Sequence, residues 1–357
     1  MSKLLKKNPR EIAAALIENM PENKYVARVE TAGPGFMNFY LTFDWLYDNV
    51  SYILENGESY GKVEDGNGKK VMVEYISANP TGPMHIGNAR GGALGDSLAE
   101  VLSWAGYEVA REFYVNDYGN QIEKFAVSLN TRFLQAVYGE DCIKMPEDAY
   151  HGQDITDHVK AYINEFGDGI KDSEESERKS KLTAYALEKN IESLKRDTGK
   201  YGITYDKWFF ESSLHESGKV NEVIELLKKN GYTYEKEDAL WFKATEFGAE
   251  KDVVLIRSNS YPTYFASDIA YHKDKIDRGF DMLINIWGAD HHGHVARMKG
   301  ALSAIGEDGD KLTVILMQLV RLIKDGEPYK VSKRSGKAVT LTDLLEDIGC
   351  DAARFFF

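Results

Sequence analysis

The spacing of apolar residues in the middle of the chain predicts alternating strands and helices. Residues 71–77 form a short, mostly apolar run that predicts a strand. Between residues 86 and 105 the apolar positions recur at helical spacing, and Gly106 is a typical C-terminal cap. Residues 109–115 predict a second strand. This order of strand, helix and strand is typical of a parallel βαβ unit.

A second set of elements with the same character follows residue 250. It contains strands at 253–256, 282–287 and 312–317 and helices at 268–278 and 294–305. We expect the parallel sheet to resume at residues 253–256. The predicted fold class is therefore α/β, with a Rossmann-type parallel sheet, a helical insertion and a small α+β N-terminal module.

A separate pattern near the N-terminus predicts the small α+β module. Asn8 can cap a helix whose first turn accommodates Pro9. Residues 26–29 and 36–41 predict two strands, and residues 44–55 predict a helix.

The same patterns suggest five segments. Residues 116–250 are mostly helical and charged, which indicates an insertion between two halves of the sheet. The strongly apolar end at residues 354–357 leads us to expect a piece of a longer chain. The expected boundaries are 1–66 for the N-terminal module, 67–127 for the first half of the sheet, 128–250 for the insertion, 251–335 for the second half and 336–357 for the start of a further region.

Composition narrows the class of protein. The 357 residues carry 28% charged side chains and a net charge of −13, which argues against a general nucleic-acid binder. No stretch is long and apolar enough to predict a membrane span. The two cysteines lack metal-ligand spacing, so a cytoplasmic, reduced protein is the simplest interpretation.

The segment from Pro83 to Asn88 lies between a predicted strand and a predicted helix. A helix N-terminus offers unpaired N–H groups and a favourable dipole to phosphate. His85 and Asn88 lie at this terminus, and Gly87 lets a nucleotide approach the backbone. The alternative is that His85 merely caps the helix.

The segment from Lys330 to Arg334 lies in a polar loop near the end of the chain. A flexible ammonium such as that of Lys333 can follow moving phosphate charge. Taken alone, this run of charge is better explained as a solvated loop.

Together the two segments resemble the signatures of class I aminoacyl-tRNA synthetases. In that family the first usually ends in histidine, where this chain has Asn88, and the second usually has methionine at the position of Val331. A closer resemblance, over nearly the whole chain, is to the arginyl-tRNA synthetases. The matching segments are residues 74–83, 116–121, 263–268, 287–293 and 351–357.

The resemblance implies a ligase that activates arginine with ATP and Mg²⁺, releases pyrophosphate and transfers arginine to tRNA(Arg). It implies that residues 1–66 are part of a tRNA-contacting module, and that residues 336–357 lead to a C-terminal anticodon-binding bundle lying beyond this sequence. The implied catalytic residues are His85, Asn88, Lys330, Ser332 and Lys333. The implied ATP-binding residues are His85, Gly87, Asn88, Gly288, Asp290, His291 and Lys333.

An arginine site needs carboxylates and other acceptors, because guanidinium is planar, always charged and rich in donors. Tyr264 lies four residues before Asp268, on the same face if the segment is helical. The resemblance implies that these two hold the guanidinium and that Glu74, Ser77 and Asn79 contact the rest of the amino acid. It adds Asp117 to the site. Each acid taken alone could equally be an ordinary surface carboxylate.

The histidines at residues 291, 292 and 294 superficially suggest a metal site. Neighbouring histidines on a tight turn cannot easily face one ion, and no cysteine assists, so we expect no protein-bound metal. Two other functions stay open at this point: a nucleotidyl-transferring enzyme that activates a small acid without tRNA, and a non-catalytic RNA-binding relative. Arginine-dependent ATP turnover would separate them from the ligase.

Overall fold

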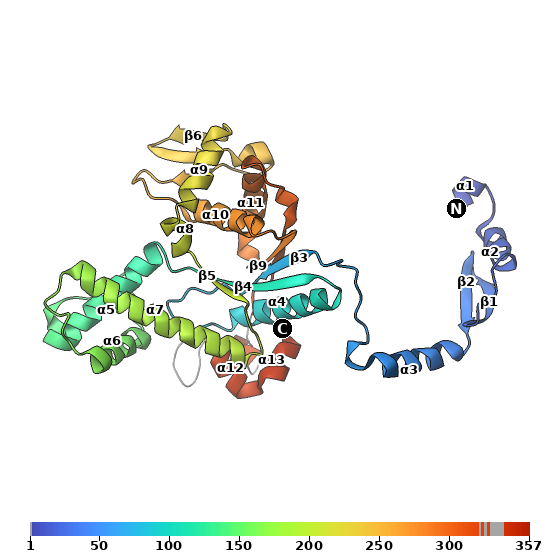
Figure 1. Cartoon of the computed structure of the whole chain (residues 1–357), viewed down its shortest axis with the longest axis horizontal. Helices are drawn as coiled ribbons and strands as arrows, with labels where there is room; N and C mark the ends of the chain where they lie inside the picture. Colours follow the sequence, from blue (N-terminus) through green and yellow to red (C-terminus); the bar gives the residue numbers. More distant parts are fainter. Residues whose placement is uncertain (1, 321–322, 325–326, 329–338) are drawn as a thin grey trace. The chain divides into compact units, whose positions relative to one another are not determined.

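The computed structural model describes residues 2–320, 323–324, 327–328 and 339–357. The chain divides into two compact units, residues 1–63 and residues 64–357 (Figure 1). No helix among the described residues is long and apolar enough to cross a membrane.

The first unit is the small α+β module that the sequence predicts. Asn8 caps α2, its side chain accepting a hydrogen bond from the Arg10 N–H, and Pro9 occupies the first helical position. Gly35 turns the antiparallel hairpin with a φ of +124°, and a Cβ there would lie 2.6 Å from the Pro9 Cβ. The elements are α1 (Ser2–Leu5), α2 (Pro9–Glu18), β1 (Val26–Ala32), β2 (Phe36–Leu41) and α3 (Asp44–Asn56).

The second unit is built on a five-stranded sheet with the order β10-β9-β3-β4-β5, in which all neighbours are parallel. The predicted α/β fold is therefore confirmed. The strands are β3 (Lys70–Glu74), β4 (Glu108–Val115), β5 (Lys207–Phe210), β9 (Met282–Gly288) and β10 (Leu312–Met317).

Helices cover the sheet and extend beyond it (Figure 1). Their bounds are α4 (Gly87–Trp104), α5 (Asn120–Tyr138), α6 (Gln153–Phe166), α7 (Glu175–Lys200), α8 (Ser212–Glu216), α9 (Lys219–Lys229), α10 (Tyr264–Asp277), α11 (His292–Ala304), α12 (Leu341–Ile348) and α13 (Cys350–Phe356). Helices α5, α6 and α7 pack on one another around a separate apolar core.

The expectation that the parallel sheet resumes at residues 253–256 is wrong. This strand, β8 (Val253–Ile256), pairs antiparallel with β7 (Ala239–Phe242), which pairs with β6 (Thr233–Lys236) in a separate sheet. A short apolar run predicts a strand but does not specify its partner. Conversely, β5 lies within the segment assigned to the helical insertion and is an edge strand of the main sheet. Outside these sheets, β11 (Ile323–Lys324) and β12 (Glu327–Pro328) form a short antiparallel pair.

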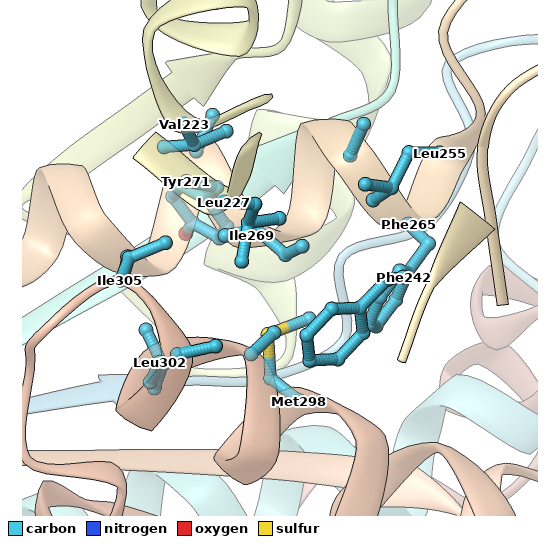
Figure 2. Close-up of a cluster of buried hydrophobic side chains, with 14 of the residues drawn as sticks. Val223, Leu227, Phe242, Leu255, Phe265, Ile269, Tyr271, Met298, Leu302 and Ile305 are labelled. Carbon is cyan, nitrogen blue, oxygen red and sulfur yellow. The ribbon is translucent and has the colours of Figure 1, made fainter. Parts of the chain in front are cut away.

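Both faces of the main sheet are buried, as expected for parallel strands. On β3, Met72 faces one core whereas Val71 and Val73 face the other, following the two-residue period of a strand. Figure 2 shows the first core, where α9, α10 and α11 meet β7 and β8. Across the other face, α4 approaches the sheet so closely that a Cβ at Gly95 would lie 2.2 Å from the Cγ of Tyr75.

Candidate active site

A cavity lies at the carboxyl ends of the parallel strands. Strand β3 lies between β4 and β9, so the connections leave it in opposite directions and open a crevice there. This strand-end cavity has a volume of about 370 Å³. Glu74 lines it from β3, Tyr114 from β4, Gly288 from β9 and Met317 from β10.

The N-terminus of α4 opens onto this cavity. Gly87 and Asn88 line it, and a Cβ at Gly87 would meet no atom within 4 Å. The Asn88 amide oxygen accepts from the His85 N–H at 3.1 Å. The exposed His85 lines an adjoining cavity of about 730 Å³, which Asn88 also borders.

The backbone around His85 is joined to the chain that follows the second signature. The Ile86 N–H donates to the Val339 carbonyl at 3.1 Å, and the Leu341 N–H donates to the Met84 carbonyl at 2.9 Å. Residues 84–86 and 339–341 are thus close in space although about 250 residues separate them in sequence. Lys330, Ser332 and Lys333 lie outside the described residues.

Glu74 lies at the end of a buried chain of hydrogen bonds. It accepts from the Lys275 ammonium at 2.6 Å and from the Ser77 hydroxyl at 3.0 Å. The same ammonium donates to the Asn285 amide oxygen at 3.1 Å, so the Asn285 NH₂ group faces His272 Nε2 at 2.8 Å. His272 Nδ1 therefore carries the proton and donates to the Asp268 carbonyl at 2.7 Å. Burial and the nearby Lys275 charge lower the pKa of His272, which is neutral.

Asp268 and Tyr264 both lie on α10, which confirms the predicted helix. Asp268 lines the strand-end cavity, and its carboxylate lies 3.0 Å from His294 Nε2. Tyr264 lines a neighbouring cavity of about 420 Å³, together with Tyr118 and Ser267. The two predicted partners therefore border two adjacent cavities.

Glu211 was not identified from the sequence. It directly follows β5 at the carboxyl end of the sheet, is 2% exposed and lines the Tyr264 cavity. Burial raises the pKa of Glu211 to about 7, although a Ser267 hydrogen bond opposes the shift. An acid directly after an apolar run could have indicated a residue at the end of a strand. We did not predict β5, because the segment that contains it was interpreted as helical.

The remaining predicted site residues differ in whether they line a cavity. Ser77 lines the strand-end cavity and, with Asn79, the His85 cavity, whereas Asp117 lines none of these three. The Asp117 carboxylate accepts from the Ser212 N–H at 2.9 Å and its hydroxyl at 2.7 Å, directly beside Glu211. Gly288 and His291 line the strand-end cavity, but the exposed Asp290 does not.

The backbone at the end of β3 is strained where the cavities meet. Ile76 and Ser77 have φ values of +68° and +48°, which β-branched and other non-glycine residues rarely adopt. The turn brings the Ser77 hydroxyl to Glu74 and to the Tyr114 N–H, at 3.2 Å from the latter.

Comparison with known proteins places this geometry in a family. The model described as tRNA synthetases class I (R), catalytic domain, matches residues 49–354. The chain belongs to the class I arginyl-tRNA synthetase family. A second model, described as the arginyl tRNA synthetase N terminal domain, matches residues 1–41.

Individual family members are similar over long stretches. The arginine–tRNA ligase of Acetivibrio thermocellus is 56% identical over all of this chain, which spans 64% of that relative. A crystal structure from Campylobacter jejuni, whose description names an arginyl tRNA synthetase, is 37% identical with a TM-score of 0.80, covering 88% of this chain and 68% of that one. The Thermus thermophilus arginyl-tRNA synthetase, at 22% identity and a TM-score of 0.67, shares the fold over 99% of this chain and 66% of its own.

A helix N-terminus with an open glycine fits a phosphate chain, and Trp287, Gly288 and His291 provide an aromatic and backbone surface beside it. No three histidine, cysteine, aspartate or glutamate side chains in the described part of the chain are grouped so that they could share a metal ion.

Proposed function

We propose that this chain carries the catalytic part of an arginine–tRNA ligase. The enzyme activates arginine with ATP, forming arginyl-adenylate and pyrophosphate, and then transfers arginine to tRNA(Arg). The observation that carries the proposal is the strand-end cavity, where Asp268 and the N-terminus of α4 meet, next to the Tyr264 cavity that contains Glu211. We place this reaction in the cytoplasm and assign residues 1–66 a part in contacting tRNA.

The arginine side chain lies between Asp268 and Glu211 in this proposal. Among the described residues, neither carboxylate has a lysine or arginine nitrogen within 4 Å, and their nearby partners are His294 and His215. Burial lowers the pKa of His215, which is therefore neutral near pH 7. Two carboxylates without a permanent cation favour a guanidinium ligand, which can donate to both. Tyr264 closes the pocket with its hydroxyl group.

The other end of the amino acid faces the end of β3, where Glu74, Ser77 and Asn79 supply oxygen atoms. Asp117 supports the site by holding Ser212, the residue next to Glu211. A missing hydrogen-bonding group on a competing amino acid would leave buried acceptors unpaired, and such a loss rejects the competitor steeply.

ATP lies across the N-terminus of α4, with its adenosine beside Gly288 and His291 and Asp290 in the adjoining loop. The Asn88 amide oxygen accepts a hydrogen bond from the His85 N–H, so the Asn88 NH₂ group can donate to phosphate. His85 and Gly87 complete this end of the site. Negative charge grows on phosphate oxygens as pyrophosphate leaves, and donors fixed in advance stabilise it. We assign Lys330, Ser332 and Lys333 to the pyrophosphate, and Mg²⁺ enters with ATP.

The test is arginine-dependent exchange of labelled pyrophosphate into ATP, with and without tRNA(Arg). Exchange with arginine but not lysine supports the proposal, and its absence under both conditions contradicts it. The Asp268→Asn variant removes one charge at constant shape. Loss of a charged hydrogen bond of about 1.5–3 kcal/mol weakens arginine use by about 10- to 150-fold. The KM for ATP should stay within about threefold of the original value.

A further inference from the structure

Helix α10 contacts the sheet with a fully buried lysine. Lys275 is 0% exposed, and its ammonium lies 2.6 Å from Glu74, 3.1 Å from Asn285 and 4.1 Å from the centre of the Tyr271 ring. A buried ammonium is costly unless it is paired, and an apolar pair of similar volume is often at least as stable. The apolar residues shown in Figure 2 already pack α10 against its neighbouring elements. Packing alone therefore does not account for the charge.

The position of Lys275 affects the charge of the strand-end cavity. Glu74 and Asp268 both line this cavity. Lys275 pairs with Glu74, and Asn285 and His272 connect the same ammonium to the backbone of Asp268. With the lysine present, one of the two carboxylates is neutralised, and the other carries the net negative charge of the cavity.

We propose that Lys275 is a positioning and specificity-determining residue that neutralises Glu74, so that Asp268 alone gives the strand-end cavity its net negative charge beside the guanidinium held between Asp268 and Glu211. The inference rests on the proposed arginine site. It concerns the balance of charge in the pocket and not any direct contact between Lys275 and arginine. The relevant quantity is the ratio of the affinities for arginine and for citrulline, which has the shape of arginine but no charge.

The test compares Lys275→Met, Glu74→Gln and the double variant by calorimetric titration with both ligands. Glu74→Gln leaves an unpaired cation and lowers the arginine-to-citrulline ratio, whereas Lys275→Met leaves an unpaired carboxylate and raises it. Unit charges about 6 Å apart at an effective dielectric constant near 20 change binding by about a hundredfold, and water in the open cavity reduces this to about tenfold. The double variant, which keeps an amide oxygen at position 74, returns to within about threefold of the original ratio.

Lys273→Met is the matched control, because Lys273 lies on the same helix but pairs with Asp277 and Glu307, away from the cavity. It should leave the ratio unchanged. If Lys275→Met does not fold, Glu74→Gln is compared with the double variant, and removal of the lysine must raise the ratio.

The role given to Lys275 is overturned if the variants lose stability while the arginine-to-citrulline affinity ratio stays unchanged. It is also overturned if all three variants lose affinity for both ligands to the same extent. An original protein that binds arginine no better than citrulline overturns the proposed function and this inference with it. The two failures are therefore distinguishable.

Discussion

Binding of arginine should weaken as the pH falls below about 7, because Glu211 must be ionised to hold a guanidinium group. Burial raises the pKa of Glu211 to about 7. The groups that face it are Tyr114 from β4, Ser267 and Asp268 from α10, Asp117 from the preceding loop and His215 from α8. Burial lowers the pKa of His215, so its protonation follows only at lower pH.

The expected magnitude follows from the fraction of ionised Glu211. A group with a pKa near 7 is about half ionised at pH 7 and about one-tenth ionised at pH 6, so the dissociation constant for arginine rises by about fivefold between pH 7 and pH 6 and by about tenfold for each further pH unit. The same shift affects folding. Between pH 4.5, the ordinary pKa of a glutamate, and about pH 7, the folded state retains a proton that the unfolded state has released. Stability attributable to Glu211 therefore decreases as the pH rises through this interval.

The assay is calorimetric titration with arginine between pH 6 and 8 in two buffers with different ionisation enthalpies. At pH 6 binding should release about one proton, and at pH 8 none. Glu211→Gln should bind weakly and without pH dependence, whereas Glu216→Gln on the exposed face of α8 should behave as the original protein. A pH-independent affinity in the original protein, or unchanged pH dependence in Glu211→Gln, would refute the role given to Glu211.

Two further predictions concern the framework of the site. Glu112→Gln should lower the free energy of unfolding by about 3–5 kcal/mol, because it breaks the buried ion pair with Arg278. The control is Glu108→Gln at an exposed position on the same strand, which should lower it by at most about 1 kcal/mol. Equal losses for the two variants in denaturant titrations would contradict the role of the buried pair. Gly95→Ala should destabilise the protein by about 1–3 kcal/mol, because its Cβ would overlap the buried Tyr75 side chain beneath α4. Gly199→Ala in α7 has open space and should stabilise by about 0.5–1 kcal/mol, so a stable Gly95→Ala would show that α4 can move away.

The elements that could be predicted from sequence are those whose signals are local. Asn8 and Pro9 mark the start of α2, and the apolar run of β9 is long enough to define a buried strand. The partner of β8 could not be predicted, because a four-residue strand carries too little pattern to distinguish one sheet from another.

The candidate site divides along the same line. The place of His85 and Asn88 at a helix N-terminus could be predicted, because a strand and a helix flank them in sequence. The roles of Lys275 and Glu211 depend on contacts with residues far away in the sequence, such as the 201-residue separation between Lys275 and Glu74. Nothing local distinguishes a buried lysine on α10 from the neighbouring Lys273, which lies nearer the surface.

The most direct test of the account is calorimetric titration of this chain with arginine, lysine and citrulline, each in the presence of a non-hydrolysable ATP analogue. Arginine should bind, and lysine and citrulline should be rejected, because Asp268 and Glu211 need a charged, forked donor. Binding of the ATP analogue without any preference for arginine would contradict the assignment of the pocket and favour a different nucleotidyl-transfer reaction.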